Sequence, residues 1–216
     1  MMPLSSPPSE YSVKVKICGL SRPEDIDSAN RLLPDYIGFV FAPRSRRFIL
    51  PQTAASLCQK LNRQIRPVGV FVNEPLSSLE AILNRVPLDL IQLHGSEDNT
   101  YLSRIRQLTD CPLIQAFALQ TAADCEKAMA SSADFLLLDG VSAGSGVPFD
   151  WNLLTGINRP YFLAGGLSPD TLADALLKNS PFAVDVSSGV ETNGKKDYHK
   201  MKAFIETARG FPVSGE

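Results

Sequence analysis

A cysteine and an aspartate, each ending a short apolar segment and each followed by glycine, are the residues best suited to acid–base chemistry. Cys18 ends VKVKIC before Gly19, and Asp139 ends FLLLD before Gly140. A thiolate can accept a proton, and a carboxyl group with a raised pKa can donate one. Taken alone, Cys18 is more typical of a small buried hydrophobic residue, and Asp139 could equally be a helix cap or one half of a structural ion pair. A base and an acid on different strands could grip a ligand between them.

Two glycine-bearing segments have the composition of an anion-binding site. Gly165 and Gly166 follow the apolar YFLA, and Ser187, Ser188 and Gly189 follow AVDV. Glycines in such loops let backbone N–H groups approach phosphate oxygens closely. The same glycines would also suit ordinary tight turns, but two such loops after neighbouring strands favour phosphate.

The segment APRSRR supplies Arg44, Arg46 and Arg47 in one loop. One arginine directed inward could pair with a substrate carboxylate through two parallel hydrogen bonds. The other arginines fit a solvated basic turn. His94, which ends IQLH, is more typical of a hydrogen-bonded wall residue than of a catalyst.

Lys16 lies two residues before Cys18, so the two side chains share one face of a strand. If Cys18 faces a central cavity, Lys16 faces the interior one layer below. A buried lysine needs a carboxylate nearby, and Asp185 or Asp139 could supply it. A cation beside Cys18 would also favour the thiolate.

These candidates fall at the ends of short apolar segments that alternate with amphipathic ones. The predicted strands are 13–18, 36–41, 67–72, 88–94, 113–117, 135–139, 161–164 and 183–186. The predicted helices are 23–33, 51–62, 76–85, 98–108, 122–131, 151–155, 169–178 and 198–209. Eight strand–helix units predict a single-domain α/β chain folded as a (β/α)₈ TIM barrel, with the site at the C-terminal ends of the strands. A doubly wound open sheet is the alternative, but no G-x-G-x-x-G follows the first strand.

Composition sets limits on function. The 216 residues are 44% hydrophobic and 20% charged, with a formal net charge of -2. This balance offers no basic face for nucleic acid, and the apolar runs are too short to cross a membrane. We expect the barrel domain to span 13–211, with a disordered Pro/Ser-rich tail at 1–12 and a C-terminal tail at 212–216.

The four cysteines lie far apart in the sequence and form no C-x-x-C pair, and the two histidines lack metal-ligand spacing. A zinc site is therefore not expected. Scattered cysteines in a chain of this length indicate reduced thiols and a cytoplasmic protein.

The ordered motifs give the chain a family resemblance. It resembles phosphoribosylanthranilate isomerase over residues 13–211, through the segments VKICGL, YIGFVFAPRSRR, VGVFVN, IQLHG, LLLDG, GSG at 144–146, LAGGL and PFAVDVSSGVE. The resemblance implies an Amadori rearrangement in tryptophan biosynthesis, in which an aminoaldose phosphate becomes an aminoketose phosphate. It also implies a sugar-phosphate substrate and no metal or organic cofactor.

The resemblance also implies roles for individual residues. The family's general base falls on Cys18, its general acid on Asp139 and its anthranilate-binding arginine on Arg47. Phosphate falls on the loops described above, at Gly165, Gly166, Ser187, Ser188 and Gly189. We add His94 and Asp185 as substrate-binding candidates.

Two other functions stay open at this point. One is a different sugar-phosphate isomerase on the same barrel, such as a bisubstrate enzyme that also serves histidine biosynthesis. A cysteine rather than an aspartate at position 18 argues against it. The other is a non-catalytic sugar-phosphate-binding module, which would need neither Cys18 nor Asp139.

Overall fold

The computed structural model describes residues 12–140 and 151–211. Our predicted tails lie outside these ranges, except Ser12, which is buried. The GSG segment at 144–146 also lies outside them. Within the described ranges, every helix falls short of the length and apolarity that crossing a bilayer requires.

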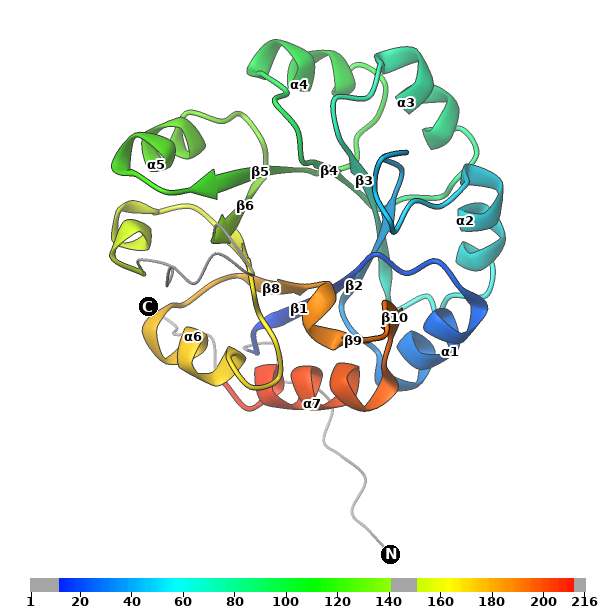
Figure 1. The fold of residues 1–216 in the computed structure, drawn as a ribbon. Helices are drawn as coiled ribbons and strands as arrows, with labels where there is room; N and C mark the ends of the chain where they lie inside the picture. The colour runs from blue at the N-terminus through cyan, green and yellow to red at the C-terminus, as the bar shows by residue number, and fades with distance from the viewer. Residues whose placement is uncertain (1–11, 141–150, 212–216) are drawn as a thin grey trace, which may run out of the picture.

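Eight parallel strands close into one barrel, each hydrogen-bonded to the next and β8 to β1, as Figure 1 shows. The strands are β1 (Lys14–Cys18), β2 (Tyr36–Val40), β3 (Arg66–Phe71), β4 (Leu90–Leu93), β5 (Leu113–Leu119), β6 (Phe135–Gly140), β7 (Tyr161–Ala164) and β8 (Ala183–Val186). The predicted (β/α)₈ barrel is therefore confirmed, and the doubly wound alternative is wrong.

Helices ring the barrel in Figure 1. They are α1 (Pro23–Leu32), α2 (Pro51–Cys58), α3 (Leu76–Leu83), α4 (Asn99–Ile105), α5 (Ala122–Met129), the 3₁₀ helix η1 (Trp151–Gly156), α6 (Leu172–Lys178) and α7 (Tyr198–Arg209). A short 3₁₀ helix η2 (Ser188–Val190) and a two-stranded hairpin, β9 (Glu191–Thr192) and β10 (Lys195–Lys196), lie between β8 and α7. The sequence analysis missed the hairpin, because strands of two residues leave no periodic pattern.

Six of the predicted helices are longer than the observed ones, most of all those predicted over 51–62, 98–108 and 169–178. We expected a helix over 51–62, but α2 ends at Cys58, because the next backbone N–H groups bond three residues back, as in Leu61 N to Cys58 O at 3.1 Å. We expected another over 169–178, but α6 begins at Leu172. Before it, Thr171 folds back, and its hydroxyl accepts the Ser168 N–H at 3.0 Å.

The core has an outer and an inner part. Outward-facing strand residues pack with the helices, as Val15 and Ile17 of β1 do. One inner layer fills the barrel with side chains from several strands: Tyr36, Val68, Leu90, Ile114, Leu137, Phe162, Ala164 and Ala183. Lys14, Lys16 and Cys18 occupy the opposite face of β1 from Val15 and Ile17, so the alternate lysines of VKVKIC point toward the barrel axis.

Lys16 and Lys14 allow a matched stability test on one strand. Lys16 is fully buried and pairs with Asp185 at 2.9 Å, whereas Lys14 is 34% exposed and pairs with Asp35 at 3.2 Å. We expect Lys16→Met to lower the free energy of unfolding by roughly 3–5 kcal/mol, because it leaves a buried carboxylate unpaired. Lys14→Met should lower it by about 0–1 kcal/mol. Urea unfolding measures both, and similar losses would contradict a special role for the buried pair.

Candidate active site

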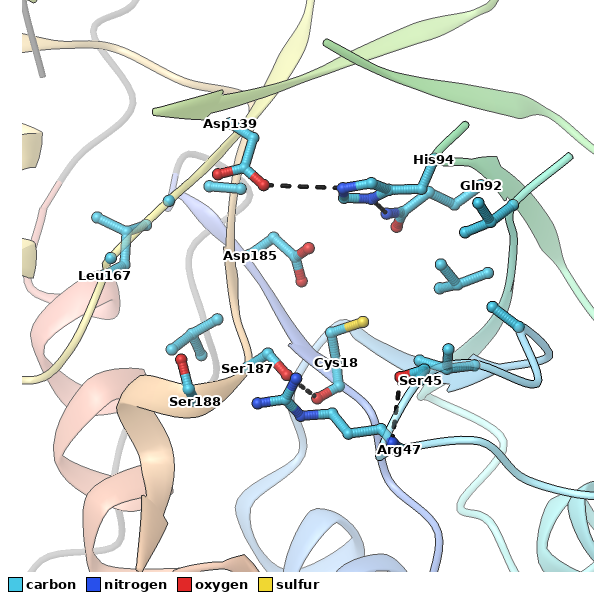
Figure 2. Close-up of a pocket in the computed structure, with 18 residues that line it drawn as sticks. Cys18, Ser45, Arg47, Gln92, His94, Asp139, Leu167, Asp185, Ser187 and Ser188 are labelled. Atoms are coloured by element: carbon cyan, nitrogen blue, oxygen red, sulfur yellow. Dashed lines mark hydrogen bonds and ion pairs between the residues drawn. The ribbon is translucent and has the colours of Figure 1, made fainter. Parts of the chain in front are cut away.

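A pocket of about 450 Å³ opens at the C-terminal end of the barrel strands (Figure 2). Nine of the ten predicted site residues line it: Cys18, Arg47, His94, Asp139, Gly165, Gly166, Asp185, Ser187 and Ser188. Gly189, the tenth, is not among the lining residues. A Cβ on Gly189 would collide with the carbonyl oxygen of Leu167, so this glycine lets the loops after β7 and β8 pack closely.

Cys18 is buried at the end of β1, with its side chain directed into the pocket (Figure 2). Burial raises the pKa of the thiol, and the charge of Asp185 raises it further. Lys16 and Lys196 lower this pKa, as a nearby cation should, but they do not overcome burial. The expected cation is therefore present, yet the Cys18 pKa lies above its ordinary value.

The buried lysine takes its carboxylate from Asp185 rather than from Asp139. Lys16 Nζ donates to Asp185 Oδ1 at 2.9 Å, and the two residues lie opposite each other where β1 pairs with β8. Burial lowers the pKa of Lys16, but Asp185 and Cys18 more than offset it, so the pKa is raised overall. The lysine therefore stays charged beneath Cys18.

Asp139 lies at the end of β6, on another wall of the pocket from Cys18 (Figure 2). Burial raises the pKa of its carboxyl group, the charge of His94 lowers it, and that of Asp185 raises it, with a net shift upward. A carboxyl group with a raised pKa keeps its proton to a higher pH. Asp139 therefore has the environment of a general acid.

His94 faces Asp139, with Nε2 3.7 Å from Oδ2, which is too long for a hydrogen bond. On its other side, Nδ1 lies 2.9 Å from Nε2 of Gln92, one layer below on β4. The Gln92 amide thus contacts one ring nitrogen and leaves the other, Nε2, facing Asp139. Gln92 is therefore the residue that orients the ring of His94.

Of the three arginines in the loop after β2, only Arg47 lines the pocket. Its Nε and Nη2 donate to the two carboxylate oxygens of Glu191, at 2.7 and 3.1 Å. Gly19, with φ +82°, lies beneath the arginine, and a Cβ there would run into Cδ of Arg47. The glycine after the cysteine thus makes room for the side chain of Arg47.

The loop after β7 has two consecutive glycines in the left-handed region, Gly165 at φ +92° and Gly166 at φ +64°. A Cβ on Gly165 would meet the backbone of Gly140 and the carboxylate of Asp139, so the loop packs directly against the end of β6. In the loop after β8, the hydroxyl of Ser187 donates to the carbonyl oxygen of Cys18 at 3.0 Å. The two glycine-bearing loops therefore contact the strand ends that carry the candidate acid and base.

Two residues that the sequence analysis missed support this wall. Glu191 holds Arg47, and Lys196 donates both to Glu191 and to the backbone of Ser187. Both lie on the hairpin that the strand pattern did not reveal. The described residues contain no group of three or more His, Cys, Asp or Glu side chains placed to hold a metal ion.

Comparison with known proteins agrees with this geometry. The family model for N-(5'-phosphoribosyl)anthranilate isomerase matches residues 15–207. The chain is 43% identical over 204 residues to the N-(5'-phosphoribosyl)anthranilate isomerase of Thermoanaerobacter sp. (strain X514), covering 92% of this chain and 98% of the relative. It is 42% identical over 198 residues to that of Streptococcus mutans, covering 91% and 98%.

Solved structures give the same result. Phosphoribosyl anthranilate isomerase from Thermotoga maritima superimposes with a TM-score of 0.85 at 37% identity, covering 92% of this chain and 100% of that one. A structure of the isomerase in complex with reduced 1-(o-carboxyphenylamino)-1-deoxyribulose 5-phosphate gives 0.83 at 36% identity, with the same coverage. The chain belongs to the N-(5'-phosphoribosyl)anthranilate isomerase family.

Proposed function

We propose that the chain converts N-(5-phosphoribosyl)anthranilate into 1-(2-carboxyphenylamino)-1-deoxyribulose 5-phosphate, with Asp139 as general acid and Cys18 as general base. The observation that carries the assignment is the placement of these two side chains on different walls of one pocket. A non-catalytic binder would need neither group. Family membership supports the reaction, and the pocket supports the residues.

The acid acts first in this scheme. Asp139 protonates the furanose ring oxygen, the C1–O bond breaks, and the nitrogen lone pair forms the C1=N bond of a Schiff base. Its raised pKa favours the protonated form that this step requires. Burial within the pocket supplies that shift.

The base acts on the opened chain. The Cys18 thiolate removes the proton from C2, the C2–H electron pair forms a C1=C2 double bond, and the π electrons of C1=N move to nitrogen, which gives an enolamine. Proton uptake at C1 and loss of the C2 hydroxyl proton then give the aminoketose. Oxidation at C2 balances reduction at C1, so this chemistry needs no external redox cofactor.

We assign the substrate's two anionic groups to different residues of the site. The anthranilate carboxylate is assigned to Arg47, and the phosphate to the backbone N–H groups of the loops at Gly165–Gly166 and Ser187–Gly189, all of which except Gly189 line the pocket. His94 and Asp185 line the pocket as well, and we assign them to contacts with the ribose chain. A cytoplasmic location is supported by four free thiols.

Replacing the base tests the chemical step. We expect Cys18→Ala to lower the single-turnover rate about 10²–10⁴-fold, because a positioned base contributes roughly that much. Cys111→Ala is the matched control, since that half-buried thiol bonds to the carbonyl oxygen of Leu88 outside the pocket, and it should retain the wild-type rate. Rapid-quench kinetics avoids limitation by product release. A near-normal rate in Cys18→Ala would return Cys18 to a packing role.

The pH dependence tests the pair. The productive form needs Asp139 protonated and Cys18 ionised, whereas the carboxyl group is the stronger acid even with its raised pKa. The fraction in this form is flat between the two pKa values. Below the pKa of Asp139 this fraction falls as the pH is lowered, because less Cys18 is ionised. Above the pKa of Cys18 it falls as the pH is raised, because less Asp139 is protonated.

We therefore expect a bell-shaped single-turnover profile. The bend on its acid side should lie above the ordinary pKa of an aspartate, and the bend on its alkaline side above that of a cysteine, because burial raises both pKa values. Asp139→Asn cannot ionise, so its residual rate should follow the thiolate alone, rising with pH through the Cys18 pKa and then levelling off. Because the two groups titrate as an interacting pair, the wild-type profile does not say which residue gives which limb. The Asp139→Asn variant assigns each limb to its residue. An unchanged bell in Asp139→Asn would remove Asp139 as the acid.

The arginine assignment is tested by changes that keep the charge. Arg47→Lys loses the planar fork that binds a carboxylate through two bonds, and we expect kcat/KM to fall roughly 10- to 100-fold, the worth of charged hydrogen bonds. Arg44→Lys, in the same loop but exposed and outside the pocket, should stay within about twofold. Steady-state kinetics measures both, and equal effects would contradict the choice of Arg47.

A further inference from the structure

The β9–β10 hairpin has no part in the chemistry proposed above, yet two of its side chains reach the wall of the active site. Glu191 of β9 pairs with Lys196 of β10 across the antiparallel ladder. Asn193 and Gly194 form the turn with φ +52° and +74°, the backbone that a tight two-residue hairpin requires. Glu191 and Lys196 therefore lie opposite each other in a short, regular hairpin, whose backbone Figure 1 shows.

Glu191 is the anion on which three cations converge. Arg47 binds both carboxylate oxygens, Lys196 donates to Oε1 at 2.8 Å, and Arg46 donates to Oε2 at 3.0 Å. Its side chain is only 6% exposed. Burial raises the pKa of Glu191, but the hydrogen bonds from Arg47 and Lys196 outweigh it and lower the pKa to about 2. The carboxylate of Glu191 is therefore ionised in the folded enzyme at neutral pH.

The contact with Glu191 fixes which edge of Arg47 is available. A guanidinium has five N–H donors, and Glu191 uses one on Nε and one on Nη2. The edge formed by Nη1 and Nη2 still has the geometry to bind a second carboxylate through two parallel bonds. With Gly19 beneath the side-chain stem, the guanidinium is held from two sides.

Lys196 extends the connection to the loop after β8. Its side chain is 1% exposed, and Nζ donates to the carbonyl oxygen of Ser187 at 2.9 Å. The hydroxyl of Ser187 in turn donates to the carbonyl oxygen of Cys18. Arg47, Glu191, Lys196, Ser187 and Cys18 thus form one continuous chain of polar contacts.

We infer that Glu191 is a positioning residue that holds the outer edge of Arg47 toward the carboxylate of the substrate. Through Lys196 it also ties this arginine to the loop that we assign to phosphate. Arg47 and Lys196 together outweigh the single negative charge of Glu191, so a positive charge remains beside the pocket for an anionic ligand. The inference rests on the proposed function, since it presupposes that Arg47 binds the anthranilate carboxylate.

Two stable ligands can separate positioning from a general effect on the fold. One is reduced 1-(2-carboxyphenylamino)-1-deoxyribulose 5-phosphate, and the other is the same molecule without its carboxylate. We expect Glu191→Gln to weaken the first about 10-fold by calorimetry, as loss of a well-oriented charged hydrogen bond would. The second should bind within about twofold of wild type. In turnover, KM should rise by a similar factor with kcat nearly unchanged.

Arg46→Gln is the matched control, because Arg46 contacts the same carboxylate but is 63% exposed, and it should leave both affinities unchanged. Glu191→Gln leaves the buried Lys196 without its counter-charge, so Glu191→Asp is the second variant. It keeps the charge but withdraws it by one methylene, and the same selective loss is expected. Circular dichroism checks that each variant is folded.

The possible outcomes separate failure of this inference from failure of the proposed function. If wild type binds the two ligands equally, Arg47 does not bind the carboxylate, and the proposed assignment of Arg47 fails. If wild type prefers the carboxylate and folded Glu191 variants keep that preference, the positioning role is wrong. Equal weakening of both ligands would likewise make Glu191 a structural residue only.

Discussion

The buried ion pair between Lys16 and Asp185 is the constraint on which the active-site wall depends. It joins β1 to β8, the seam at which the barrel closes, and it lies one residue layer beneath Cys18. Neither charge could stay buried alone, since an unpaired ion is costly to desolvate. The pair therefore fixes the relative position of two strand ends. From those ends come Cys18 on one side and the Ser187 loop on the other.

Much of this arrangement could be predicted from the sequence, because buried strands have a distinctive apolar pattern and side chains alternate along them. That logic placed Lys16 beneath Cys18 and required a carboxylate, although it could not choose between Asp185 and Asp139. Roles for single residues, such as Arg47, came from family resemblance. Glu191 could not be found, because its partner Arg47 lies 144 residues away and only the closed barrel brings them together.

The electrostatics of the pocket impose opposite demands on its base and its acid. Burial raises the pKa of both Cys18 and Asp139. For Asp139 the shift helps, since the acid must keep a proton, but for Cys18 it opposes formation of the thiolate. The productive ionisation is thus a minority form in the free enzyme. Lys16 and Lys196 partly offset the effect at Cys18, which gives two buried lysines a chemical reason to lie near one thiol.

Asp185 affects the pKa of both the acid and the base. Its charge raises the pKa of Asp139, which favours the acid, and also raises that of Cys18, which hinders the base. Lys16 interacts with both groups: it pairs with the carboxylate of Asp185 and lowers the pKa of the Cys18 thiol. One ion pair can therefore favour the protonated carboxyl group of Asp139 on β6, while its lysine limits the rise in the pKa of Cys18 on β1. Separation of acid and base onto different strands makes this division possible, since Asp185 acts on Asp139, whereas both charges of the pair act on Cys18 and partly cancel there.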